Sequence, residues 1–330
     1  MHPITRIRVI HLLVVVFFIQ CTTGESRAAE PIHQVALKRQ LKLIDDTPSH
    51  KPVIMRLDIE LETLAKQAAG KPKATRAKWL AAGLSPQARL YRRFGMSDLV
   101  GFSKLVLGEA KYPHVNLHRD AFAGRDLSAE VQAAYQKVVK AYGKPSKKAP
   151  IYKVAYGYQK TTNAAMEGND QRTGRHIVIL NRSALAEGDD WDAAIVHETW
   201  HTFQGNIGKM LAERAIHEGV ATHLTKVIAP KLEDHKIMLW DKRKWQAAEA
   251  RKAAIIKAFM RAKDSSDQKT INSFMVLGKS LSDVKGSPDR CGYYVGLLAC
   301  RAWVKANPKA KPADLIAANP AAILKSLAGK

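Results

Sequence analysis

Two histidines separated by three residues, His197 and His201, place the strongest constraint on how this chain can fold. Apolar residues recur at helical spacing over residues 191–203, and Asp189 or Asp190 can cap a helix that begins there. Positions i and i+4 of a helix are separated by about 40° around its axis, so both imidazoles leave the same face and can converge on one ion. The segment therefore predicts a helix that carries part of a metal site.

Glu198 completes a histidine-glutamate-x-x-histidine motif, in which the glutamate directly follows the first histidine. On a helix it lies about 100° around the axis from His197, beside the metal but not among its ligands. There it can accept a proton from a metal-bound water and act as a general base. Catalytic zinc sites use three protein ligands and leave a fourth position for water. We therefore expect one Zn²⁺ per chain, held in part by His197 and His201.

The third ligand is expected on a second helix, predicted over residues 210–228. Glu218 is the preferred candidate, because it lies 17 residues beyond His201, about the distance that a turn and a returning helix need. The small residues Gly219 and Ala221 follow it and allow a close approach to the first helix. The competing candidates are His217, His223 and Glu213.

Apolar periodicity predicts a helical N-terminal half. Residues 33–142 form a series of predicted helices, which include residues 35–44, 53–69 and 127–142. A polar, proline-containing segment, residues 143–150, then marks a boundary.

Beyond this boundary, apolar and β-branched residues predict strands over residues 151–158 and 176–181, joined by a glycine-containing loop over residues 162–174. Almost all of the remaining chain is predicted to be helical. We therefore expect a predominantly helical α+β fold, with a small sheet in a domain at residues 150–330. A helical region of unknown role, residues 29–149, precedes that domain.

Residues 1–28 are predicted to be a signal peptide. Arg6 and Arg8 precede an apolar run over residues 9–19, which is too short to span a membrane as a helix. Cleavage is expected after Gly24 or after Ala28, which leaves a periplasmic or secreted protein without a transmembrane domain.

Cys21 raises the question of a lipid anchor. Residues 18–20 lack the small residue that normally precedes a lipidated cysteine, so lipid anchoring is not expected. A retained N-terminal anchor is the other alternative to a cleaved signal peptide.

The formal net charge of +23 predicts attraction to acidic partners, such as nucleic acid, anionic lipid or an acidic envelope polymer. However, the lysines are spread along the chain, and few clusters of arginine and aromatic residues could read bases. Specific nucleic-acid binding is therefore not expected, and a solvated basic surface is the simpler interpretation.

A third motif, Gly292-Tyr293-Tyr294-Val295-Gly296, opens a predicted helix that runs to residue 304. Together with the histidine motif and the Glu-Gly-x-Ala sequence at Glu218, it resembles the gluzincins, the thermolysin clan of zinc metallopeptidases. The chain is especially similar to predicted bacterial zinc-dependent proteases, over residues 150–327. This resemblance implies a zincin-like catalytic domain in which the strand at residues 176–181 edges the cleft and binds an extended peptide.

One position departs from that family. Thermolysin has an aspartate four residues after its glutamate ligand, where it orients a zinc-bound histidine. Thr222 occupies this position here, so the orienting group must come from elsewhere.

The resemblance implies an exported zinc metalloendopeptidase that acts on a peptide or protein substrate. Glu198 would be the general base, and Tyr293 would donate a hydrogen bond to the oxyanion, with Tyr294 as the second candidate and packing in the core as the alternative for both. Two other functions stay open: a catalytically silent basic binding protein on a metallopeptidase fold, and an amidase that acts on an acidic envelope polymer.

Overall fold

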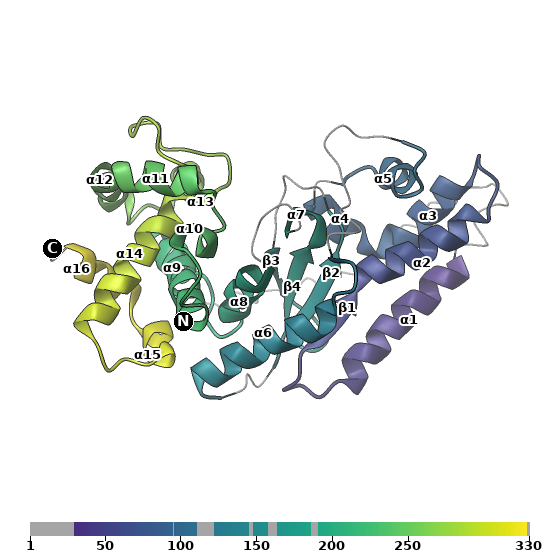
Figure 1. Cartoon of the computed structure of the whole chain (residues 1–330), viewed down its shortest axis with the longest axis horizontal. Coiled ribbons are helices and arrows are strands. Elements are labelled where there is room, and N and C mark those ends of the chain that lie inside the picture. Colours follow the sequence, from purple (N-terminus) through teal and green to yellow (C-terminus); the bar gives the residue numbers. More distant parts are fainter. Residues whose placement is uncertain are drawn as a thin grey trace, which may run out of the picture.

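The computed structural model describes residues 30–94, 96–110, 122–144, 148–157, 164–185 and 191–328. The predicted signal peptide lies outside these residues. Within them, the chain is predominantly helical and carries one small mixed sheet (Figure 1). The predicted α+β class is therefore confirmed. Nowhere in the described segments is a helix both long enough and apolar enough to cross a membrane.

The described residues of the N-terminal region form six α-helices, and most of their buried side chains belong to one core. They are α1 (Glu30–Asp46), α2 (Leu57–Ala69), α3 (Arg76–Leu84), α4 (Ala88–Arg93), α5 (Leu99–Val106) and α6 (Leu127–Tyr142). Local sequence sets the ends of α6: the Asp126 carboxylate accepts hydrogen bonds from the backbone N–H groups of Ser128 and Ala129. Gly143 then ends the helix at a φ of +91°, in the left-handed region that favours glycine.

The sheet has the strand order β1-β2-β4-β3, with β1, β2 and β4 parallel and β3 antiparallel to β4. The strands are β1 (Val53–Arg56), β2 (Ile151–Ala155), β3 (Ala164–Asn169) and β4 (His176–Asn181). Strand β4 therefore lies inside the sheet, and β3 takes the edge position that was expected for residues 176–181.

Alternate residues of the strands face two separate cores. Tyr152 and Val154 point into a core shared with α6, α8 (Trp191–His201) and the C-terminal helices. Ile151 and Ala155 point into the other core, which α2 to α5 complete. The helix that bears the two histidines is thus packed against one face of the sheet.

Two strands differ from the sequence-based prediction. Residues 53–69 were expected to form one helix, but the first four pair with β2 before α2 begins. The expected loop at residues 162–174 contains β3, in which Gly168 has a φ of +117° beside a bulge. In both cases a partner distant in sequence decides the conformation, which local periodicity cannot reveal.

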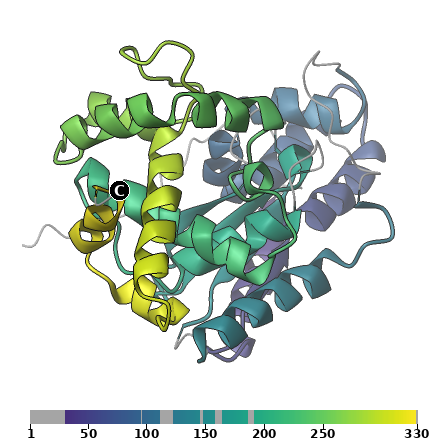
Figure 2. The ribbon, with the colours of Figure 1, turned by 60° about the vertical axis from the view of Figure 1, so that its left-hand side comes forward.

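The C-terminal half continues as helices, with α8 lying between α9 and the sheet in Figure 1. Besides α8, they are α7 (Arg182–Leu185), α9 (Leu211–Ile228), α10 (Asp234–Ile237), α11 (Lys242–Ala250), α12 (Lys252–Ala262), α13 (Gln268–Met275), α14 (Cys291–Ala306), α15 (Pro312–Ala317) and α16 (Pro320–Ala328). Figure 2 shows α11 and α12 lying across one end of α14.

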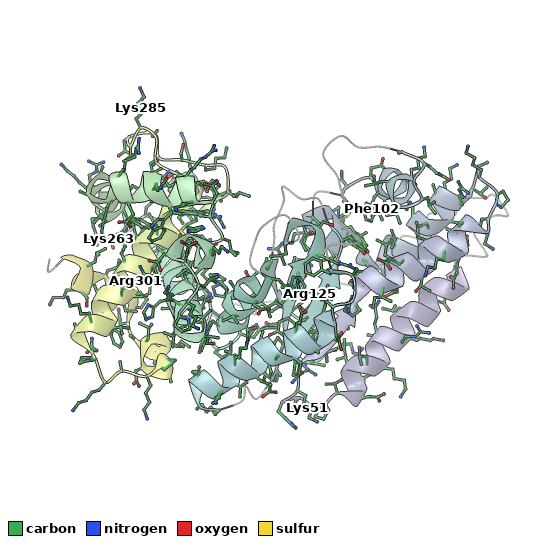
Figure 3. All side chains as sticks on the ribbon, in the orientation of Figure 1. Lys51, Phe102, Arg125, Lys263, Lys285 and Arg301 are labelled. Carbon is green, nitrogen blue, oxygen red and sulfur yellow. The ribbon has the colours of Figure 1, made fainter. Side chains whose placement is uncertain are left out.

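Basic side chains are distributed over the whole molecule. Lys51 and Lys285, for example, are both exposed and lie on opposite sides of it (Figure 3). This distribution agrees with a solvated basic surface.

Candidate metal centre

Helix α8 holds its two histidines inside the protein. Trp191, Ile195 and Trp200 belong to the core, and the Thr199 hydroxyl lies 2.6 Å from the hydroxyl of Tyr152 on β2. These contacts fix the rotation of α8 about its axis, which turns the opposite face of the helix toward α9. Both imidazoles are buried, His197 at 6% exposure and His201 at 4%.

Three donor atoms from α8 and α9 meet between the two helices. The Nε2 atoms of His197 and His201 lie 3.1 Å apart. The Oε2 atom of Glu218 lies 3.2 Å from each of them. The structure thus brings together the three residues predicted to be metal ligands.

The shape of this triangle fits a tetrahedral ion. Zinc binds imidazole nitrogen and carboxylate oxygen at about 2.0–2.2 Å, and in a tetrahedron with bonds of about 2.0–2.1 Å neighbouring donors lie about 3.3–3.4 Å apart. The observed edges of 3.1–3.2 Å are close to that value. Two imidazoles and one carboxylate are also a donor set that zinc accepts, and three ligands leave one position open.

Glu198 lies in the same neighbourhood without joining this triangle. Its carboxylate belongs to a looser group with the two imidazoles, whose donor atoms all lie within 4.8 Å of one another. Glu218 fits a third ligand position better than Glu198, because its Oε2 atom lies 3.2 Å from both Nε2 atoms. Glu198 is then a buried acidic neighbour of these three side chains.

The competing ligand candidates point elsewhere. The His217 ring stacks on the outer side of the His201 ring, with centroids 4.6 Å apart and an interplanar angle of 5°. The Glu213 carboxylate accepts a hydrogen bond from the Met210 backbone N–H and so caps α9. Burial and, more weakly, the positive charge of Arg301 lower the pKa of His223 to about 4.

The two tyrosines of the third motif have different neighbours. Burial and the negative charge of the nearby Glu218 carboxylate raise the pKa of Tyr293 well above its usual value. Tyr294 donates instead to Glu249 at 2.7 Å and packs against Trp240 and Trp245. Tyr293 therefore lies at the candidate metal centre, and Tyr294 belongs to the core.

The charges at the site are strongly coupled. Burial opposes ionisation of Glu218, but His201 and His197 outweigh it and hold the pKa of this carboxyl well below its ordinary value. Burial also lowers the pKa of His201, yet Glu218 and, more weakly, Glu198 raise it to about 9. Without a metal, a proton on His201 thus supplies the positive charge that balances the Glu218 carboxylate.

Glycines bring α9 and α14 into contact behind the site. A Cβ atom on Gly219 would lie 2.2 Å from the backbone of Gly296, and one on Gly296 would lie 1.9 Å from the carbonyl oxygen of Ala215. Gly219 was expected to allow close approach to α8, and this interpretation is wrong, because the residue faces α14. The crossing holds Glu218 and Tyr293 next to each other.

One residue of the site was missed in the sequence. Gln204 follows α8 by three residues, and its Oε1 atom lies 2.6 Å from Nδ1 of His201. Its Nε2 atom donates to the backbone carbonyl of His217 at 2.8 Å. A polar side chain one turn beyond the second histidine was the available signal.

Comparison with known proteins gives one family. Residues 193–327, less than half of the chain, match the model of the family described as gliding motility protein GldB. The match begins inside α8 and ends in α16, so it contains the whole candidate metal centre. No curated protein and no solved structure matches the chain.

This match overturns the assignment to the gluzincins. The family that resembles the chain is one of gliding-motility lipoproteins and not of zinc metallopeptidases. The expected metallopeptidase function and the amidase alternative are therefore wrong. The comparisons do not support the expected peptide substrate either. The physical reason is that the histidine motif specifies how two imidazoles reach one ion, whereas a reaction requires more of the site than that.

Proposed function

We propose that the chain is a metal-binding protein of the cell envelope, with one zinc ion held by His197, His201 and Glu218. The observation that carries the proposal is the triangle of two imidazole nitrogens and one carboxylate oxygen with edges of 3.1–3.2 Å. Surface groups rarely lie in such an arrangement by accident, and here all three side chains are largely buried.

The ion would join two helices. Glu218 belongs to α9, whereas both histidines belong to α8, so a shared metal cross-links the sheet-bound helix to the C-terminal helical layer. The chemistry that zinc would supply is a positive charge that compensates Glu218 and Glu198 inside the protein. The chain's own part is to hold the donors in place, with the Tyr293 hydroxyl close to the Glu218 carboxylate.

The envelope location is supported by one feature of the sequence and by the family match. An apolar run at residues 9–19 follows Arg6 and Arg8, as in an export signal. The matching family consists of lipoproteins, which favours lipid anchoring at Cys21. This reverses the expectation drawn from residues 18–20, which lack a small residue before the cysteine.

The description of the matching family as a gliding motility protein supports a role in an envelope assembly that contacts other proteins. In that role the metal would stabilise the C-terminal layer.

If Cys21 carries the anchor, Cys21→Ser should move the protein from the membrane fraction to the soluble fraction after cell lysis. Retention of the variant in the membrane fraction would contradict lipid anchoring.

Metal analysis of purified protein tests the central part of the proposal. Wild type should contain close to one zinc per chain, and His201→Ala and Glu218→Gln should each lose most of it. The matched controls are His50→Ala and Glu233→Gln, which change an exposed histidine and an exposed glutamate and should retain the zinc. Full zinc content in both ligand variants would overturn the site.

A further inference from the structure

Gln204 connects the two helices of the metal centre through its side-chain amide. Oε1 lies 2.6 Å from Nδ1 of His201 on α8, and Nε2 lies 2.8 Å from the backbone carbonyl of His217 on α9. Gln204 is partly buried in the turn that follows α8, where Gln204 N donates to the His201 carbonyl at 3.3 Å. The amide is thus held at both ends.

The polarity of these two hydrogen bonds determines where the His201 proton sits. A backbone carbonyl can only accept, so the atom of Gln204 that faces His217 must be the NH₂ group. Its carbonyl oxygen then faces His201, and a carbonyl oxygen requires a donor. Nδ1 of His201 must therefore carry a hydrogen, and in the neutral ring Nε2 keeps its lone pair.

That lone pair points toward the other donors of the site, because Nε2 is the atom that lies 3.1 Å from His197 and 3.2 Å from Glu218. On the basis of the proposed zinc site, we propose that Gln204 is a positioning residue that fixes the tautomer and the orientation of His201 for metal binding.

Two other groups near the ligands, Thr222 and His217, do not have this role. Thr222, which occupies the position of an aspartate in thermolysin, donates along its own helix to the Glu218 carbonyl at 2.8 Å. The His217 ring stacks on His201, which limits its tilt but supplies no acceptor in the ring plane. Nδ1 of His197 is buried and has no hydrogen-bond partner among the described residues. His201 is therefore the better oriented of the two histidines.

Two substitutions separate positioning from simple bridging. Gln204→Glu keeps an acceptor for His201 but loses the donor to His217, whereas Gln204→Met keeps the length of the side chain and loses both groups. Loss of such a partner typically lowers metal affinity about 10- to 100-fold. Positioning therefore predicts that Gln204→Met weakens zinc binding by about that factor, while Gln204→Glu stays within about threefold of wild type or binds more tightly.

The experiment is a zinc titration of the full protein against a competing chelator, with circular dichroism to verify folding. Gln246→Met, an exposed glutamine on α11, is the matched control and should bind zinc like wild type. Nitrogen NMR of the zinc-loaded proteins gives a second readout: the Nδ1 proton of His201 should exchange with water faster in Gln204→Met than in wild type or Gln204→Glu. If Gln204→Met does not fold, Gln204→Leu provides the same comparison.

Equal losses of affinity in Gln204→Glu and Gln204→Met would overturn the inference, because they would make the bridge to His217 the important contact. Wild-type affinity in Gln204→Met would overturn it as well. Both outcomes differ from a failure of the zinc site itself, in which wild type would bind no zinc.

Discussion

Glu218 carries a negative charge inside the protein, and the surrounding residues show how this is tolerated. The Nε2 atoms of His201 and His197 lie 3.2 Å from its Oε2 atom, and the Tyr293 hydroxyl lies nearby. The electrostatic balance is reciprocal, since the pKa of His201 is raised to about 9 while that of Glu218 is well below its usual range. At the proposed site a zinc ion and a proton would therefore compete for the same position.

This competition predicts the pH dependence of zinc binding. Below pH 9 the metal-free protein holds a proton on His201 that zinc must displace, so zinc affinity should rise with pH by about tenfold per unit. Chelator competition between about pH 6.5 and 8.5 measures the slope. Glu233→Gln should keep the same slope, and an affinity that does not change over this range would contradict the account.

At the scale of single residues, much of the candidate site could be predicted from the sequence. The spacing of His197 and His201 fixes a shared helix face, and Glu218 follows at the distance of a returning helix. Gln204 could not be predicted in the same way, because its role depends on the His217 carbonyl, which belongs to another helix.

The crossing of α9 and α14 is the element-scale feature on which the site depends. Gly219 and Gly296 face each other there, so the two backbones are in contact and no side chain fits between them. Because α9 carries Glu218 and α14 carries Tyr293, the distance between these helices sets the distance between the two side chains.

Gly296→Ala should therefore destabilise the fold. The added methyl group would lie 1.9 Å from the Ala215 carbonyl oxygen, and separating the helices should lower the free energy of unfolding by about 2–3 kcal/mol. Denaturant unfolding measures the change. The matched control is Gly70→Ala at the end of α2, where φ is −76° and the nearest atom is 3.6 Å away. Equal stability of the two variants would show that α9 and α14 do not depend on this contact.

Elements with strong local signals could be predicted from the sequence, and elements that depend on distant pairing could not. Helix α6 has apolar periodicity, an Asp126 cap and Gly143 at its end, and it was predicted over the same residues. Strand β1 has only four residues, directly before a helix, and forms by pairing with β2 nearly 100 residues later. Its hydrophobic residues fit a helix equally well.

At the scale of the whole molecule, a buried ion pair connects the N-terminal region to the sheet. Arg182 follows β4, and its Nη1 atom donates to Asp58 on α2 at 2.9 Å and to the Tyr156 hydroxyl at 2.8 Å. Asp58 is fully buried and also pairs with Arg56 at 2.8 Å. With β1 paired to β2, the sheet crosses the predicted boundary at residues 149 and 150, although the division into regions stays a prediction.

Arg182→Met should show how much this ion pair contributes to the free energy of unfolding. It leaves Asp58 buried with one fewer partner, which should lower the free energy of unfolding by about 3–5 kcal/mol. Arg261→Met removes an exposed pair with Asp283 and should cost at most about 1 kcal/mol. Thermal or denaturant unfolding compares the two, and similar small losses would mean that the Arg182 pair does not hold the regions together.

The function could be predicted from the sequence less well than the residues of the candidate site. The first two motifs bring candidate metal ligands together, and this geometry is compatible with a structural or binding role as well as with hydrolysis. The match over residues 193–327 to a gliding-motility family then decided against a peptidase. Fold class and ligand positions follow from periodicity and spacing, whereas the use of the site depends on partners that the sequence does not encode locally.

X-ray absorption at the zinc edge tests the central claim most directly. Wild-type protein loaded with one zinc should show a shell of nitrogen and oxygen donors at about 2.0–2.2 Å, with the outer scattering of two imidazole rings. Glu218→Gln should change this shell, and Glu233→Gln should not. Two results would contradict a site built from His197, His201 and Glu218. One is a shell of oxygen atoms without imidazole scattering, and the other is a sulfur atom of Cys291 or Cys300 at about 2.3 Å from the zinc.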